Sequence, residues 1–153
     1  MIRGWWDSRQ YAAINRLSRI TGRFDDANAI LTPEPAMTDP TANCLFCRIL
    51  RAEIPAKKVY ENEHVFAFED IDPKAPTHVL VIPKRHFAGL KEAQAEDADV
   101  IGRCHLAAAD IARQRKIENG YRTVLNVGPG AGQSVFHLHI HLLGGRALSW
   151  PPG

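Results

Sequence analysis

Three of the seven histidines in this 153-residue sequence occupy alternate positions, at His137, His139 and His141. The segment 135–143 alternates between imidazole and apolar side chains, as a half-buried strand does. Residues two apart in a strand face the same side, about 6.6–6.8 Å from one another. We therefore expect the three imidazoles to share one face of a strand. The apolar residues between and beside them are expected to face a core: Phe136, Leu138, Ile140 and Leu142.

Two kinds of chemistry suit a face lined with imidazoles. Neutral imidazoles bind metal ions, although alternate strand residues diverge and no carboxylate flanks these three. An imidazole nitrogen can also attack phosphorus, and its neighbours can donate hydrogen bonds to the phosphate oxygens. A glycine-rich loop with two polar side chains precedes the strand and favours the phosphate chemistry, because backbone amides can approach an anion there. That loop holds Gly128, Gly130 and Gly132, then Gln133 and Ser134.

Two cysteines form a CxxC pair at Cys44 and Cys47. Such a pair supplies half of a tetrahedral zinc site. Residues 1–36 lack the apolar stretch of a secretory signal, so we expect a reducing, cytoplasmic location and no disulfide. Cys104 lies in a helical apolar pattern and is expected to be a buried core residue.

The remaining patterns predict the elements that position these residues. Helices are expected at 44–52 and 95–116, the second closed by Asn119-Gly120. Strands are expected at 59–60, 64–68, 78–82, 121–127 and 135–143. This order indicates an α+β domain with a mostly antiparallel sheet of five strands, a short N-terminal helix and one long helix.

Composition narrows the partners. The apolar runs are shorter than the ~20 residues of a membrane helix, so no membrane span is expected. The net charge of +2 is too small to indicate electrostatic binding of nucleic acid by the whole protein. Residues 1–40 are expected to be an extension, disordered or preceding a true start at Met37, because acidic residues count against a transit peptide. Residues 41–153 form the expected domain.

The segment from Gly132 to Arg146 and the terminal Trp-Pro-Pro-Gly resemble the histidine-triad (HIT) family, in its Hint branch of purine nucleoside phosphoramidases. Three further segments match that branch: Ile54–Lys57, Ala75–His78 and Val81–Lys84. The resemblance covers residues 41–153. It implies a HIT-like fold and a homodimer formed through the long helix and the strand 121–127. Trp150 would then reach the partner's active site.

The resemblance also implies hydrolysis of purine nucleoside 5′-phosphoramidates through a nucleotidyl-histidine intermediate. His139 would be the nucleophile. His141 would contact the phosphate and assist the leaving group, and His78 would support the proton network of these two histidines. The implied phosphate-binding residues are Asn126, Gly132, Gln133 and Ser134. The implied nucleoside-binding residues are Phe46, Ile49, Phe68, Asp70 and Ile71, although Phe46, Ile49 and Phe68 are equally typical of a core. The alternatives are a dinucleoside polyphosphate hydrolase and a nucleotide-binding interaction protein with incidental hydrolysis.

Some members of the family bind a structural zinc, and their ligand set matches Cys44, Cys47, His86 and His137 here. His137 would then be structural and not catalytic. The other interpretation is two reduced thiols beside an exposed His86. No metal is expected to take part in the chemistry, and no role is expected for His64 or His105.

Overall fold

The computed structural model describes residues 39–152. The expected extension 1–40 lies almost entirely outside the described residues, so its boundary with the domain stays a prediction. The described elements are α1 (Leu45–Leu50), β1 (Lys58–Glu61), β2 (Val65–Glu69), β3 (Thr77–Pro83), α2 (Ala98–Gln114), β4 (Tyr121–Val124) and β5 (Ile140–Gly144). Short 3₁₀ turns lie at Leu90–Glu92, Ala95–Asp97 and Pro129–Ala131. Within 39–152, no helix is both long and apolar enough to cross a membrane.

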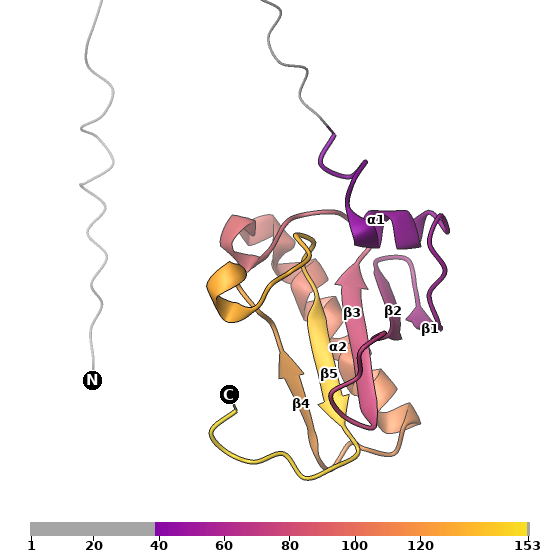
Figure 1. Cartoon of the computed structure of the whole chain (residues 1–153), viewed down its shortest axis with the longest axis vertical. Coiled ribbons are helices and arrows are strands. Elements are labelled where there is room, and N and C mark those ends of the chain that lie inside the picture. Colours follow the sequence, from indigo (N-terminus) through magenta and orange to yellow (C-terminus); the bar gives the residue numbers. More distant parts are fainter. Residues whose placement is uncertain (1–38, 153) are drawn as a thin grey trace, which may run out of the picture. The chain divides into compact units, whose positions relative to one another are not determined.

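The five strands form one sheet in the order β1-β2-β3-β5-β4, and every neighbouring pair is antiparallel. Figure 1 shows this sheet with the long helix α2 behind it and α1 beside the ends of β2 and β3. The α+β class, the five-stranded antiparallel sheet and the single long helix are therefore confirmed. In the middle of the sheet, β3 pairs with β5 so that Leu80 lies opposite His141.

Two apolar clusters hold the layers together. The larger one packs α2 on one sheet face, and Cys104 in it is fully buried, which confirms the expected core cysteine. The smaller one joins Phe46 of α1 to Phe68, Leu80 and Ile82 on the opposite face. Because successive side chains in a strand point to opposite faces, β3 contributes to both clusters and all seven of its residues are buried.

The ends of both helices differ from the sequence prediction. α1 is shorter than the predicted 44–52, and the start of the predicted 95–116 is a 3₁₀ turn. α2 ends at Gln114, and the chain turns at Lys116, which has a left-handed φ of 55°. The Ile117 N–H donates to the Ala112 carbonyl at 2.9 Å, a Schellman pattern that terminates the helix. The predicted closure by Asn119-Gly120 was wrong, because backbone hydrogen bonds end the helix earlier.

The last strand is shorter than the predicted 135–143, and His137 and His139 lie before its start at Ile140. Pro83, at the end of β3, has no N–H to donate, and its carbonyl accepts a hydrogen bond from the His137 ring at 2.9 Å. The Leu138 N–H donates instead to the Phe87 carbonyl at 2.9 Å. Strand pairing therefore stops before the first two histidines.

Two further strand predictions need correction. Phe136 was expected in the core with its three apolar neighbours but is 53% exposed, because it lies in the bend before β5 and not in a strand. Leu138, Ile140 and Leu142 are buried as expected. The strand predicted at 121–127 ends at Val124, where its antiparallel pairing with β5 ends at His141.

Candidate functional site

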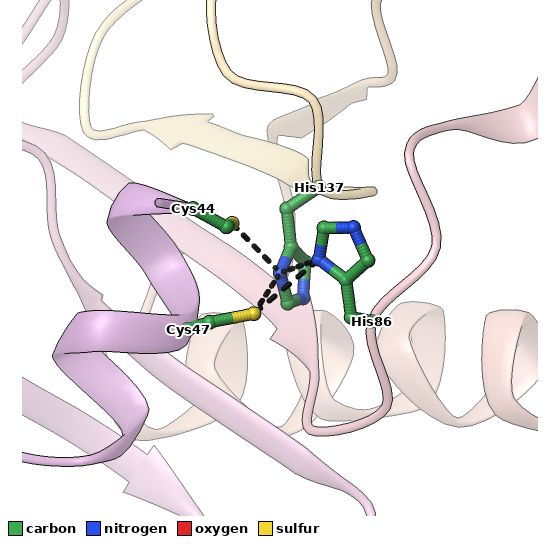
Figure 2. Close-up of side chains that lie close together, drawn as sticks. All are labelled: Cys44, Cys47, His86 and His137. Carbon is green, nitrogen blue, oxygen red and sulfur yellow. Dashed lines mark hydrogen bonds between the residues drawn. The ribbon is translucent and has the colours of Figure 1, made fainter. Parts of the chain in front are cut away.

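Four side chains from three parts of the fold meet beside α1. Cys44 and Cys47 lie at the start of α1, His86 follows β3, and His137 precedes β5 (Figure 2). The Nδ1 atoms of the two histidines are 3.3 Å apart. The Cys47 Sγ lies 3.3 Å from the His86 Nδ1 and 3.5 Å from the His137 Nδ1, and the Cys44 Sγ lies 3.5 Å from the His137 Nδ1. The four ligand atoms all lie within 4.8 Å of one another, so one metal ion could contact all of them.

The backbone prepares His137 to be a ligand in this cysteine–histidine cluster. A carbonyl oxygen can only accept, so the His137 Nε2 must donate to Pro83, and its Nδ1 keeps a free lone pair toward the cluster. Metal-ligating histidines are commonly oriented in this way by their second ring nitrogen. Burial lowers the pKa of His137 to about 4, so the ring is neutral at physiological pH, which a metal ligand requires.

Burial acts in the opposite direction on the thiol. It raises the pKa of Cys47 to about 11, with a further contribution from the neighbouring Cys44, so the metal-free thiol stays protonated. A bound cation would reverse this preference, because the thiolate is the form that ligates metals. The Cys47 thiol and the two neutral rings thus become good ligands when a cation replaces the thiol proton.

A second group of polar side chains lies at the other end of the same face. His78 on β3 and His141 on β5 are joined by a hydrogen bond of 2.9 Å between the His78 Nε2 and the His141 Nδ1. The Asp70 carboxylate lies 3.3 Å from the His78 Nε2. These three side chains could by spacing also bind a cation, since their ligand atoms lie within 4.8 Å of one another.

Backbone contacts fix which nitrogen of each ring carries the proton. The Lys74 N–H donates to the His78 Nδ1 at 3.1 Å, so the proton of neutral His78 is on Nε2. Because that N–H points at the His141 Nδ1, the proton of neutral His141 is on Nε2. Burial lowers the pKa of both rings, that of His141 to about 4, so both are neutral near pH 7.

His139 is held in the opposite tautomer. Its Nδ1 lies 2.7 Å from the His137 carbonyl oxygen and must donate to it, which leaves the lone pair on Nε2. The ring centroids of His139 and His141 are 5.1 Å apart. The His141 Nε2 is buried and has no hydrogen-bond partner among the described residues. A ring nitrogen with a free lone pair therefore lies beside a ring whose N–H has no partner among the described residues.

Five residues were expected to bind the nucleoside, and the structure places them differently. Phe46 and Phe68 are buried and contact each other edge to face, with ring centroids 5.5 Å apart, and Phe46 also contacts His139 at 5.3 Å. Ile49 is half-buried against the same cluster. The Asp70 side chain is largely buried beside His78, whereas Ile71 is fully exposed in the loop that follows β2.

The glycine-rich loop is braced by one of its own residues. The Gln133 side chain accepts the Gly128 N–H at 2.9 Å and donates to the Ala88 carbonyl at 2.7 Å and the Val135 carbonyl at 3.2 Å. That amide, expected to serve a phosphate, is engaged within the protein. The backbone N–H groups of Gly132 and Gln133 are bonded inside the turn. Asn126 is half-buried, and Ser134 is exposed at the end of the loop.

The backbone partners of the rings could not be predicted, because a sequence does not show which carbonyl or amide group contacts a side chain. Asp70 was not predicted to pair with His78 either. A signal for that pair existed, because the strands ending at Glu69 and starting at Thr77 form a hairpin. In its register, the Asp70 N–H donates to the His78 carbonyl at 3.0 Å, so the two residues lie opposite each other.

Comparison with known proteins adds independent information. The HIT domain sequence model matches residues 51–148. An uncharacterized HIT-like protein of Synechococcus elongatus is 54% identical over 71% of this chain and 96% of its own. A 14 kDa zinc-binding protein of Zea mays is 48% identical over 71% of this chain and 87% of its own. Adenylylsulfatase HINT1 of Arabidopsis thaliana is 39% identical over 91% of this chain and 99% of its own.

Solved structures show the same fold. A HIT family hydrolase from Legionella pneumophila superposes with a TM-score of 0.71 at 46% identity and covers 72% of this chain and all of its own. A HIT family hydrolase from Clostridium thermocellum has a TM-score of 0.69 at 48% identity, covering 71% of this chain and 95% of its own.

The neutral, buried state of His141 predicts a pH dependence of stability. In the unfolded chain a histidine binds its proton near pH 6.5, whereas burial lowers the pKa of His141 to about 4. Neutral, buried His141 therefore contributes fully to the free energy of unfolding above pH 6.5. That contribution, up to about 3 kcal/mol, is lost as the pH falls toward 4. Urea unfolding of wild type and His141→Gln between pH 4 and 8 should give a shallower pH dependence for the variant. Parallel profiles would contradict this explanation.

Proposed function

Because the chain belongs to the HIT domain family, we propose that it is a nucleotide hydrolase that cleaves purine nucleoside 5′-phosphoramidates through a nucleotidyl intermediate on His139. The observation that carries this proposal is the pair of opposite tautomers, with a lone pair on the His139 Nε2 and an N–H on the His141 Nε2. One ring is set to attack phosphorus and the other to protonate what leaves.

In the first half of the reaction, the His139 Nε2 attacks the α-phosphorus and forms a P–N bond. The P–N bond to the amine breaks, and the departing nitrogen takes the proton from the His141 Nε2. The pair acts as this acid when it has taken up one extra proton from solvent beside the bound anionic phosphate, and the Asp70 carboxylate, 3.3 Å from the His78 Nε2, stabilises that positive charge. Both rings are neutral once the amine has taken the proton. The amine leaves, and the nucleotidyl group stays on His139.

In the second half, water attacks the same phosphorus and the bond to the His139 Nε2 breaks. The proton of the water returns to the His78–His141 pair, which restores the protonated state that began the first half. The sum is phosphoramidate plus water giving nucleoside monophosphate plus amine. The Nδ1–H of His139 remains bonded to the His137 carbonyl throughout, which stabilises positive charge on the ring during attack and departure.

The surrounding residues are assigned to the two ends of the nucleotide. We assign the exposed Ser134 hydroxyl and the half-buried Asn126 amide to the phosphate oxygens, and we assign Gly132 and Gln133 to the turn that carries this loop. Asp70 can accept from ribose hydroxyls with the oxygens that His78 does not use. For the purine we assign Phe46, Ile49 and Phe68, which pack in one apolar cluster, together with the exposed Ile71.

A second substrate is favoured by one comparison. The relative from Arabidopsis thaliana is named an adenylylsulfatase. Adenylyl sulfate shares the adenylyl group with the phosphoramidate but releases sulfate, which leaves without a proton. The same nucleophile would serve both substrates, whereas the proton from His141 would matter mainly for the amine. Dinucleoside polyphosphates are a further alternative, because they also present an adenylyl phosphorus to His139.

We further propose that the cysteine–histidine cluster binds a structural zinc. With Zn–N of ~2.05 Å and Zn–S of ~2.3 Å, a tetrahedral site has N···N edges of about 3.3 Å and N···S edges of about 3.6 Å. The observed separations of 3.3 Å between the Nδ1 atoms and 3.3–3.5 Å from sulfur to nitrogen match these edges. The name of the Zea mays relative supports the choice of zinc.

We also propose a homodimer. β4 is an edge strand, so the backbone groups of its outer side have no strand partner among the described residues. Leu106 of α2 is 68% exposed in the single chain, and Tyr121 and Val127 are also exposed. Exposed apolar residues of this kind are typical of a surface that a second subunit covers. Trp150 is 84% exposed in the C-terminal tail, where it could reach the partner's active site.

Adenosine 5′-phosphoramidate turnover tests the nucleophile. His139→Ala should lower kcat/KM by roughly a thousandfold or more, because the displacement then lacks its attacking atom. His64→Ala, a histidine outside both groups, is the matched control and should keep wild-type turnover. Equal rates in His139→Ala and wild type would eliminate His139. Adenylyl sulfate and diadenosine polyphosphates assayed in parallel would rank the alternatives, and binding without turnover of any of them would favour an interaction protein.

Metal analysis of protein purified without chelators tests the zinc proposal. We expect about one zinc ion per chain in wild type and a large loss in Cys47→Ser, because a hydroxyl is a poor replacement for a thiolate ligand. Cys104→Ala removes a cysteine from the core on the other sheet face and should keep its zinc. Wild-type protein that contains no zinc, and takes up none on addition, would refute the site.

Light scattering after size exclusion tests the dimer. Wild type should elute with the mass of two chains, and Leu106→Arg should elute as one, because a charge would be buried in the proposed interface. Leu90→Arg changes an exposed leucine outside α2 and β4 and should stay dimeric. A wild-type mass of one chain at tens of micromolar would contradict the proposal.

A further inference from the structure

One residue belongs to both side-chain groups. The His137 ring contributes its Nδ1 to the cysteine–histidine cluster (Figure 2). The carbonyl oxygen of the same residue accepts the hydrogen bond that holds the His139 Nδ1–H at 2.7 Å. The position of that carbonyl, and with it the tautomer of His139, therefore depends on what holds His137.

The strand ladder does not hold it. β5 begins at Ile140, so residues 137–139 have no strand partner on β3. His137 is fixed instead by its own ring, through the cluster on one side and the Pro83 carbonyl on the other. Among the described residues, one backbone hydrogen bond anchors these three residues, from the Leu138 N–H to the carbonyl of Phe87, in the loop that also carries His86.

Aromatic packing also connects the cysteine–histidine cluster to His139. Phe46 lies next to Cys47 on α1 and contacts the His137 ring at 5.9 Å and the His139 ring at 5.3 Å, both edge to face. A shift of the cysteines would move Phe46, and a shift of Phe46 would reach both rings. Backbone and side-chain contacts thus connect the cluster to the nucleophile by two short routes.

We propose that the cysteine–histidine cluster is the positioning device of the nucleophile: with its four ligands joined, it fixes the His137 carbonyl and thereby keeps the proton of His139 on Nδ1 and the lone pair on Nε2. This inference rests on the proposed function, in which His139 attacks phosphorus. When the cluster is opened, His139 loses its fixed acceptor and its proton distributes between the two nitrogens. The fraction of rings able to attack then falls, while the nucleotide pocket is retained.

Histidine-ring nitrogen NMR reads this state without any turnover. In zinc-loaded wild type at pH 7, the His139 signals should show a protonated Nδ1 and an unprotonated Nε2. His86→Ala removes one ligand far from His139 in sequence and should give mixed or reversed tautomer signals for His139. His86→Cys keeps four ligands as a three-cysteine, one-histidine set and should restore the wild-type pattern. An unchanged Nδ1–H pattern in His86→Ala would overturn the proposal.

Kinetics give a second readout. In His86→Ala, kcat should fall by roughly 10- to 100-fold with KM for the nucleotide within about twofold of wild type, because misorientation affects attack more than binding. Ile111→Val lowers stability from the core on the other sheet face and should change neither the His139 signals nor kcat. A loss of kcat in Ile111→Val as large as that in His86→Ala would show a general stability effect and refute positioning.

Chelation of wild type replaces the variant if His86→Ala does not fold. Removal of the metal should change the His139 signals, and addition of zinc should restore them. Signals that ignore the metal would overturn the proposal. A wild type that shows the expected tautomer but hydrolyses none of the substrates would refute the proposed function alone, so the two failures are distinguishable.

Discussion

The hydrogen bond from the His137 ring to the Pro83 carbonyl decides how both groups of histidines are built. Proline cannot donate at the end of the central strand, so its carbonyl is left for a side chain and the next strand begins only at Ile140. In a continued strand, alternate residues would share one face. Release from the ladder lets His137 turn toward the cysteines while His139 and His141 stay with His78.

Backbone groups select the tautomer of the rings in both groups. In water a neutral imidazole exchanges its proton between two nitrogens, but a carbonyl or an amide beside one nitrogen selects a single tautomer. His137 and His139 each donate to a carbonyl, and His78 accepts from the Lys74 amide. Three rings thus receive assigned roles from atoms that every residue type carries.

Much of this arrangement could be predicted from residue types. The antiparallel sheet and the long helix follow from periodicity. The grouping of Cys44, Cys47, His86 and His137 came from the family resemblance, and the structure brings these four side chains together. The strand at 135–143 was overextended, because alternation cannot reveal that the partner strand ends in proline. Gln133 was expected at a phosphate because residue type alone does not distinguish an amide that stabilises its own loop from one that binds a ligand.

The residues of the cysteine–histidine cluster are far apart along the chain, since His137 follows Cys44 by 93 positions. During synthesis the two cysteines leave the ribosome long before the histidine that completes the set. The two cysteines therefore lack their histidine neighbours until β5 docks beside β3. Closure of the cluster is therefore a late event in the biogenesis of this chain.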